Sequence, residues 1–523
     1  MFFLIAWVLP ALACNLPIFP APSPTPDLDV AKAARETLAA RLFATPLATQ
    51  APPAPDPQAV PQPTGAVEPP APEVMPPQVV VTPGLPVSTL EGNTYRYITL
   101  PGDTIEALAL RFGVTEDQVL PPGLYPAQAL LPAGLMLSIP NAVGETIFYE
   151  PLLPDGEIVN GPSAADFIVQ DYIQSAGGYL STYTEETEHG SMTGAQIIQR
   201  VSNDMSINPR ILLAFLEYRS QWVRGRPEDA EKNRHPIGFY ANQYNGLYKE
   251  TVLVARQLTI GFYGWRTGKV VYLGFTGSPQ QRINPTVNAG TAALQYLFST
   301  IYKTGEWQNE LYNTRQFLLL FHEMFGDPWA RAAQIGPQLP DNLAQPVLEL
   351  PFQPGERWSF TGGPHAAWGI GTVWGGIDFA PVTGQARCTI STAWATASAP
   401  GLVLRSENGL VMIDLDGDGR EQTGWVLMYL HVAAQDRVSA GTWLNVDDRI
   451  GHPSCEGGVS TGTHIHLARK YNGEWIGADG PAPFVLSGWQ AAYGPRPYDG
   501  VLIKGESIVT ARPDGSHTSS IVR

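Results

Sequence analysis

The sequence predicts a multidomain α+β protein: a disordered proline-rich linker, a small βααβ module, a mainly helical middle domain and an antiparallel β domain at the C-terminal end. Three observations support this prediction. Prolines concentrate near the N-terminus, apolar residues recur at helical spacing in the middle, and short β-runs separated by glycines dominate the last third. A chain of 523 residues is also too long for one ordinary core.

The composition excludes some classes of function. A formal net charge of −16, with no compensating basic stripe, excludes nucleic acid as a partner, because binding a polyanion requires clustered Lys and Arg. With 49 prolines and only 15% charged residues, part of the chain must lack a packed core.

The first segment, 1–14, is typical of an export signal. Its apolar run is too short to span a bilayer and ends in small residues. Leu12-Ala13-Cys14 resembles the end of a lipobox, which implies lipidation of Cys14 and an anchor at the outer face of the membrane. A plain cleaved signal, or a short anchor, is the alternative. We therefore expect an exported protein of the cell envelope or an extracellular one. Residues 15–90 follow as a proline-rich linker, extended as polyproline II.

Residues 91–141 change character. Tyr95, Tyr97 and Thr99 alternate as in a strand, Thr104 can cap a helix that Gly113 stops, and LMLSIP forms a closing strand. The stretches YRYITLPGDTIEALALRFGV and LPAGLMLSIP resemble the lysin motif, a small βααβ module that binds peptidoglycan and chitin. The resemblance implies contact with wall glycan.

Residues 160–346 are predicted to be mainly helical. Helices are expected over 210–223, after Asn208-Pro209, and over 284–302 and 316–325. The first of them resembles the helix of lysozyme-like lytic transglycosylases that ends in a catalytic Glu followed by Ser. Here Arg219 precedes Ser220 and Glu217 lies on another side of the helix, so we expect no glycosidase activity. An unrelated helical spacer is the alternative.

Residues 348–504 are predicted to form the antiparallel β domain, with 505–523 as a C-terminal tail. Five residues of this domain form a candidate site. They are His365, Asp378, His431, His464 and His466. In THIHLA the two histidines are two residues apart, so a strand would present both on one face.

This pattern resembles the lysostaphin-like and beta-lytic zinc metallopeptidases, which hydrolyse peptide bonds in peptidoglycan. The resemblance covers about 358–475 and includes GGPH, a spacing of thirteen residues from the first His to the Asp, MYLH and VSTGTHIHLA. It implies that His365, Asp378 and His466 bind Zn2+ and that His431 and His464 assist catalysis. Two neutral imidazoles and one carboxylate leave zinc an open position for water. The division of labour between His431 and His464 stays open.

The cysteines and one acidic loop complete the candidates. If Cys14 carries lipid, Cys388 and Cys455 form an even pair in an exported protein, and we expect a disulfide between them, against two separate buried thiols. The run DLDGDG from Asp414 resembles the start of a calcium loop, but Trp425 stands where an EF-hand needs Glu, so a hairpin turn is favoured.

The sequence therefore predicts a zinc-dependent endopeptidase that cuts stem peptides or cross-bridges of peptidoglycan. The alternative is a non-catalytic envelope protein that binds peptidoglycan and regulates other wall hydrolases. An intact set of ligands favours the enzyme. The sequence leaves open which peptide bond is cut, and whether the wall is the cell's own or foreign.

Overall fold

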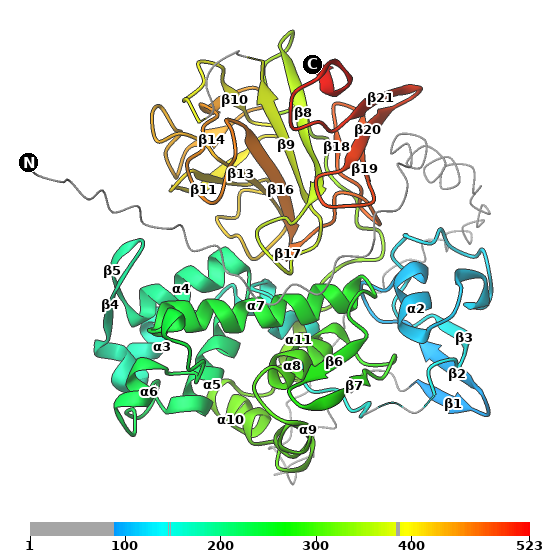
Figure 1. Ribbon diagram of the computed structural model, residues 1–523, viewed down its shortest axis with the longest axis vertical. Coiled ribbons are helices and arrows are strands. Elements are labelled where there is room, and N and C mark those ends of the chain that lie inside the picture. Colours follow the sequence, from blue (N-terminus) through cyan, green and yellow to red (C-terminus); the bar gives the residue numbers. More distant parts are fainter. Residues whose placement is uncertain (1–87, 145, 147, 383–387) are drawn as a thin grey trace, which may run out of the picture.

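The computed structural model describes residues 88–144, 146, 148–382 and 388–523 (Figure 1). The predicted export signal with Cys14, and nearly all of the predicted linker, lie outside the described residues. The described part comprises a small module, a helical domain and a β-rich C-terminal domain, so the predicted multidomain α+β fold class is confirmed. Within this described part, no helix has both the length and the apolar character that crossing a membrane requires.

The small module is a three-stranded antiparallel sheet with one α-helix. Its strands are β1 (Thr89–Glu91), β2 (Thr94–Ile98) and β3 (Met136–Pro140), and its helix is α2 (Ile105–Phe112). As predicted, Thr104 caps the helix by accepting a hydrogen bond from the Ala107 N–H. Gly113, in the left-handed region at φ 68°, ends it.

The second helix of the predicted βααβ order is only one 3-10 turn, η1 (Glu116–Gln118). Pro121 and Pro122 follow closely, and proline can neither donate the helical hydrogen bond nor allow the preceding residue an α conformation. The lysin motif resemblance therefore stays a prediction, with a shorter second helix than expected.

The helical domain surrounds the long helix α7, which packs against α4 and α8. Its helices are α3 (Val169–Ala176), α4 (Gly194–Met205), α5 (Pro209–Ser220), α6 (Ala230–Arg234), α7 (Leu247–Arg266), α8 (Ala289–Ser299), α9 (Thr304–Gln308), α10 (Gln316–Phe325) and α11 (Pro328–Ile335). Two hairpins project from it, β4 (Thr184–Thr187) with β5 (Gly190–Thr193) and β6 (Tyr272–Phe275) with β7 (Ser278–Arg282).

The three helices predicted here are confirmed as α5, α8 and α10, with shorter bounds for the first two. Helix α5 begins after Asn208, whose side chain accepts from the Arg210 N–H. It ends at Ser220 because Gln221 has a left-handed backbone, φ 57°. Trp222 and Val223 therefore follow the helix and are fully buried beyond its end.

The β domain contains one large antiparallel sheet with the order β14-β11-β12-β13-β16-β9-β8-β22, and β17 pairs with β16. Its strands are β8 (Arg357–His365), β9 (Gly376–Pro381), β11 (Gly401–Glu407), β12 (Leu410–Asp414), β13 (Trp425–Leu430), β14 (Trp443–Leu444), β16 (Ile465–Tyr471), β17 (Glu474–Trp475) and β22 (Ser520–Val522). A second sheet contains β18 (Val485–Leu486), β19 (Trp489–Tyr493), β20 (Gly500–Lys504) and β21 (Ser507–Thr510), and β10 (Ala395–Thr396) pairs with β15 (Arg449–Gly451).

Residues 505–523, set apart by sequence reasoning as a tail, continue the β domain. Strand β21 pairs with β20, and β22 pairs with β8, with Ile521 opposite Trp358. Ile521 is 1% exposed. The segment thus closes the edge of the large sheet beside the strand that carries His365.

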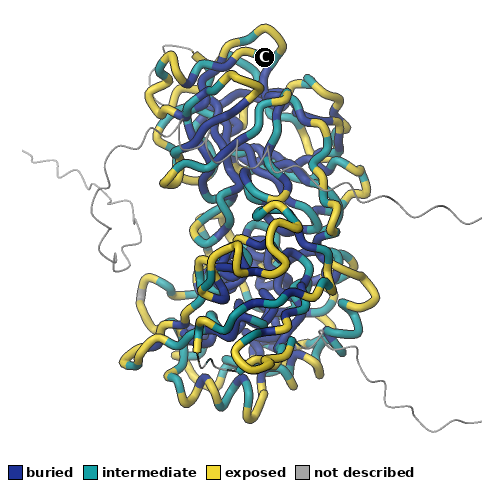
Figure 2. Tube along the Cα trace, turned by 90° about the vertical axis from the view of Figure 1, so that its right-hand side faces the viewer, coloured by how far each residue is buried: buried dark blue, intermediate teal, exposed yellow. Residues whose placement is uncertain are grey.

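Both faces of the large sheet are buried. Successive side chains of a strand point to opposite faces, so one strand contributes to two cores. On β13, Leu427 and Tyr429 enter the core of the β domain, whereas Val426 and Met428 join the core of the helical domain. Strand β12 alternates in the same way. Ion pairs cross this interface as well, with Arg405 Nη1 at 2.7 Å from Asp204 Oδ1. The helical domain and the sheet therefore share one continuous core, and buried residues fill both parts (Figure 2).

Candidate metal centre

Three neighbouring strands bring the predicted metal ligands together. His365 ends β8, Asp378 lies in β9 and His466 lies in β16, and the pairing register sets His466 directly opposite Asp378. The strand order β16-β9-β8 puts Asp378 in the middle. All three side chains are buried, at 4–6% exposed.

Glycines make room for these side chains. A Cβ built on Gly362, which pairs with Asp378, would lie 2.3 Å from Asp378 Oδ2. A Cβ built on Gly376 would lie 2.2 Å from His466 Cε1. No real Cβ tolerates such distances, so both positions must be glycine if the carboxylate and the imidazole are to keep their places.

The ligand atoms converge on one point. His365 Nε2 lies 2.9 Å from His466 Nδ1, and Asp378 Oδ1 lies 3.1 Å from His466 Nδ1 and 3.4 Å from His365 Nε2. Zinc held tetrahedrally at about 2.0–2.1 Å separates neighbouring ligand atoms by about 3.3 Å. The cluster therefore has the chemistry and nearly the spacing of three zinc ligands.

The outer nitrogens of both ligand histidines are held by backbone carbonyls. His365 Nδ1 lies 2.8 Å from the Gly363 oxygen, and His466 Nε2 lies 2.9 Å from the Ala367 oxygen. A carbonyl oxygen only accepts a hydrogen bond, so His365 Nδ1 and His466 Nε2 carry the ring protons. The lone pairs of His365 Nε2 and His466 Nδ1 therefore face each other. A cation between them would remove that repulsion, which is why the arrangement fits a metal ion.

The protonation states also suit a metal. Burial lowers the pKa of His365 to about 4, despite the opposing effect of Asp378. Burial alone would raise the pKa of the Asp378 carboxyl, but the surrounding imidazoles of His365, His464 and His466 hold that pKa well below its ordinary value. A neutral imidazole and an ionised carboxylate are the forms that bind zinc.

His431 and His464 lie side by side next to the ligands, with ring centroids 4.5 Å apart. His464 Nε2 is 3.8 Å from Asp378 Oδ1. Their Nδ1 atoms face the backbone oxygens of Glu456, at 3.0 Å from His431, and of Gly462, at 2.7 Å from His464. In the neutral form of each ring the proton therefore lies on Nδ1, and Nε2 is left to accept. Burial, reinforced by the facing histidines, lowers the pKa of His431 to about 4, so this ring is neutral at pH 7.

The backbone of His431 is strained. Its φ of 68° lies in the left-handed region, which costs a residue with a Cβ about 1–3 kcal/mol. Two hydrogen bonds hold it there, because the Ser454 N–H and hydroxyl both donate to the His431 oxygen, at 2.7 and 2.9 Å. The strand β13 ends in this turn, and the turn aims the ring at His464.

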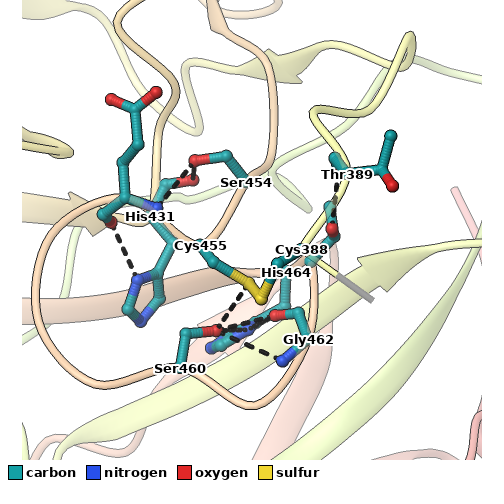
Figure 3. Close-up of a disulfide and its surroundings, with 10 residues drawn as sticks. Cys388, Thr389, His431, Ser454, Cys455, Ser460, Gly462 and His464 are labelled. Atoms are coloured by element: carbon teal, nitrogen blue, oxygen red, sulfur yellow. Dashed lines mark hydrogen bonds between the residues drawn. A yellow bond between two sulfur atoms is a disulfide. The ribbon is translucent and has the colours of Figure 1, made fainter. Parts of the chain in front are cut away.

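The expected disulfide is present. Cys388 and Cys455 are bonded, with Cα atoms 5.1 Å apart (Figure 3). Beside it the Thr463 hydroxyl donates to the Thr389 oxygen at 2.6 Å. The disulfide, together with this hydrogen bond, therefore fastens the segment that leads into His464 to the loop after β9.

Replacing both Cys388 and Cys455 with serine is expected to lower the free energy of unfolding by about 4 kcal/mol, the entropy of opening a loop with a sequence separation of 67. The approach to His464 should loosen as well, because the segment that leads into it is no longer fastened. Denaturant unfolding of the exported protein measures the first effect. Cys14→Ser is the matched control and should keep the wild-type value; an equal loss there would show that the bond is not the cause.

Tyr498 is a site residue that sequence reasoning missed. Its ring stacks on that of His365 at 4.0 Å between centroids and 20° between planes, and it is 57% exposed. The Gly363 N–H donates to its backbone oxygen at 2.8 Å. It lies beyond the stretch 358–475 that carries the resemblance. The only local signal is an exposed aromatic in a Pro-Tyr-Asp-Gly turn.

The acidic run after β12 forms a hairpin turn, as favoured. Asp414 accepts hydrogen bonds from the backbone N–H groups of Asp416, Gly417 and Gly419. The carboxylates of Asp414, Asp416 and Asp418 do lie within 4.8 Å of one another. Their bonds to the turn account for the arrangement.

In the helical domain, Glu217 is a structural residue. Its Oε2 accepts from the N–H groups of Val223 at 2.9 Å and Arg224 at 3.0 Å, and the residue is 7% exposed. Arg219 donates to the Tyr302 hydroxyl at 2.6 Å. Neither side chain is placed to protonate a glycosidic oxygen.

We therefore expect no cleavage of glycan strands by this chain. The test uses the whole chain, because the helical domain shares its core with the sheet and is unsuited to expression alone. The chain carries His464→Ala so that cleavage of peptides does not obscure cleavage of glycan. Mass spectrometry of digested peptidoglycan should show no newly cleaved glycan bond. Cleavage of glycan strands by the His464→Ala protein that is lost in the double variant with Glu217→Gln would overturn the expectation.

Comparison with known proteins gives a family match and two sequence relatives. Residues 151–339 match the family described as "LasA, N-terminal domain", which spans most of the helical domain. The chain is 26% identical over 349 residues to "Protease LasA" of Pseudomonas aeruginosa, covering 63% of this chain and 75% of that protein. It is 27% identical over 155 residues to the "Beta-lytic metalloendopeptidase" of Lysobacter enzymogenes, covering 29% of this chain and 83% of that protein.

Among solved structures, the M23 metalloprotease pseudoalterin is 21% identical with a TM-score of 0.27, over 32% of this chain and 96% of that one. The catalytic domain of lysostaphin from Staphylococcus simulans is 20% identical with a TM-score of 0.18, over 24% and 89%. The sequence relatives support the resemblance to LasA-like and beta-lytic metallopeptidases. The lysin motif and lysozyme-like resemblances remain predictions.

Proposed function

We propose that this chain is a zinc-dependent endopeptidase that hydrolyses peptide bonds in the stem peptides or cross-bridges of peptidoglycan. The convergence of His365, Asp378 and His466 carries the proposal, because two lone pairs and a carboxylate oxygen face one point at 2.9–3.4 Å. The similarity to a beta-lytic metalloendopeptidase supports the same reaction. All five residues of the predicted constellation lie together, which favours the enzyme over a non-catalytic regulator.

Zinc bound by the three ligands would supply an activated water and a Lewis acid for the scissile carbonyl. The chain's own contribution comes from His431 and His464. Their Nε2 atoms, beside the ligand cluster, can accept the proton of an attacking water or, once protonated, donate to the developing oxyanion. The exposed ring of Tyr498, stacked on His365, forms a wall that a bound peptide would contact.

The location of the enzyme is part of the proposal. We infer export from the apolar segment 1–14, and attachment of lipid to Cys14 would place the chain at the outer face of the membrane. The proline-rich residues 15–90 would then space the catalytic domain from the anchor. The small module around β2, α2 and β3 would hold it against wall glycan.

Removing the metal tests the proposed reaction. Purified protein should contain one zinc ion per chain, release peptide fragments from peptidoglycan, stop doing so after treatment with a chelator, and recover when zinc is restored. Elemental analysis and mass spectrometry of the released fragments provide the readouts. Full activity in metal-free protein would refute the zinc mechanism.

A further inference from the structure

An exposed apolar side chain stands beside the two histidines that adjoin the ligand cluster. Val459 is 97% exposed. Its neighbours in the chain lie against the two histidine rings. A Cβ built on Gly458 lies 3.9 Å from His431 Cε1, and the Ser460 hydroxyl lies 3.4 Å from His464 Nδ1 (Figure 3). Val459 therefore borders the part of the site where a bound peptide would lie.

The loop that carries Val459, residues 456–463, is held at several points. The disulfide directly precedes it, and the hydrogen bond of the Thr463 hydroxyl lies at its other end. Gly457, at φ 72°, packs so closely on the neighbouring turn that a built Cβ would lie 2.2 Å from the Asn408 oxygen. A β-branched side chain on a fixed loop has little freedom to lose, so contact with a ligand costs little entropy.

The same loop presents one charged side chain, and that side chain has partners. Glu456 Oε2 accepts a hydrogen bond from the Ala434 N–H at 2.7 Å and lies 3.9 Å from Arg437 Nη1. The rest of the loop, GGVSTGT, is uncharged. Beside the two histidines the loop therefore offers the two methyl groups of a valine and no unpaired charge.

The opposite side of the site is also without an unpaired charge. His365 on β8 and His464, just before β16, lie on opposite sides of the central strand β9. The ring of Tyr498 stacks on His365, and the two charged residues of its turn pair with each other, with Arg496 Nε 2.9 Å from Asp499 Oδ2. A peptide crossing the ligand cluster would thus pass from an aromatic ring to an apolar loop.

The reach of a peptide sets which of its residues meets Val459. Ser460, the next residue, lies against the Nδ1 side of the His464 ring, and neighbouring Cα atoms are about 3.8 Å apart. The valine side chain is therefore within roughly 10 Å of His464 Nε2. An extended peptide advances about 3.3 Å per residue, so this distance corresponds to about three residues.

We propose that Val459 contacts a substrate side chain within three residues of the cleaved bond, and that it selects an apolar side chain there, such as that of alanine, over an acidic or basic one. This inference rests on the proposed function. The peptides of peptidoglycan contain alanine as well as acidic and basic residues, so this contact would help to choose which of their bonds is cut.

The test measures kcat/KM of the full-length protein on soluble synthetic peptides. The parent peptide spans the bond that the wild type cuts in peptidoglycan. Each member of the series carries alanine, glutamate or lysine at one of the three positions on either side of that bond. At one position the wild type should disfavour both charged residues. There Val459→Lys should raise kcat/KM about fivefold for the glutamate peptide, and Val459→Glu should do so for the lysine peptide, as for an exposed ion pair of about 1 kcal/mol.

Val459→Ala should lower kcat/KM about fourfold for the alanine peptide, which corresponds to the lost contact of one methyl group, about 0.8 kcal/mol. Because Val459 is exposed, these variants should keep the zinc content and the melting temperature of the wild type. The matched controls are Val347→Lys and Val347→Glu, at a valine that is 86% exposed on the segment before the β domain. They should leave the preference for each peptide unchanged.

The proposal is overturned if the charge at position 459 changes the preference at none of the six positions, or if the Val347 variants change it equally. Such a result leaves peptide cleavage intact and refutes only the contact at Val459. A wild-type protein that releases no peptide from peptidoglycan would refute the proposed endopeptidase itself.

Discussion

Replacing His464 with alanine is expected to lower kcat for peptide hydrolysis by about 10²–10⁴-fold while the protein keeps one zinc ion per chain. His464 lies 3.8 Å from Asp378 Oδ1, outside the tighter cluster in which His365 and His466 approach within 2.9 Å. Its removal should therefore take away proton transfer or oxyanion stabilisation and leave three ligands. Metal content by elemental analysis and kcat on a soluble cross-linked peptide measure the two effects separately.

His365→Ala is the contrasting variant. It removes one of the three ligands, so both zinc and activity should be lost, and added zinc should restore neither at ordinary concentrations. Normal zinc content in His365→Ala would show that the first ligand has been misassigned. Loss of zinc in His464→Ala would move that residue into the ligand set.

Replacing Gly376, which is not one of the predicted ligands, should reduce zinc binding and activity by a similarly large factor. Gly376→Ala is expected to reduce zinc affinity and activity by at least about 10²-fold, because the new Cβ would lie 2.2 Å from His466 Cε1 and 2.7 Å from Nε2. His466 must then turn away from Asp378. Losing a hydrogen-bond partner that supports a metal ligand already costs about 10–100-fold in affinity, so displacing the ligand itself should cost about 100-fold or more. Zinc titration monitored by competition with a chelating dye gives the affinity.

Gly369→Ala is the matched control, since a Cβ at Gly369 meets nothing within 4 Å and this glycine lies in the loop between His365 and Gly376. It should bind zinc as the wild type does. If Gly376→Ala kept full zinc affinity, His466 could not hold the metal in the orientation described.

The resemblance to beta-lytic peptidases, carried by the thirteen-residue spacing from His365 to Asp378 and by the pair His464 and His466, named residues that the structure brings together. Strand geometry explains only why His464 and His466 can share one face. The glycines that clear space for them follow no periodicity, because the need for them arises only when strands β8, β9 and β16 are paired. Tyr498 was out of reach for the same reason, since its stacking on His365 joins segments far apart in the chain.

The helices were predicted in kind but less well in length. The apolar run at 210–223 continues past the end of α5, because Trp222 and Val223 are buried by tertiary packing and not by helical periodicity. Likewise the two apolar faces of β13 gave an unbroken run, WVLMYL, that shows burial on both sides but not which domain covers each side. Packing contacts between segments far apart in the chain leave no local pattern in the sequence.

The shared core between sheet and helices has a consequence for solubility. A shortened chain beginning at Leu348 would expose the sheet face that carries Met412, Val426 and Met428, all of them completely buried in the intact protein. A contiguous apolar surface on a soluble monomer invites self-association. The β domain would therefore aggregate when separated from its helical neighbour, unless polar residues replaced those three side chains.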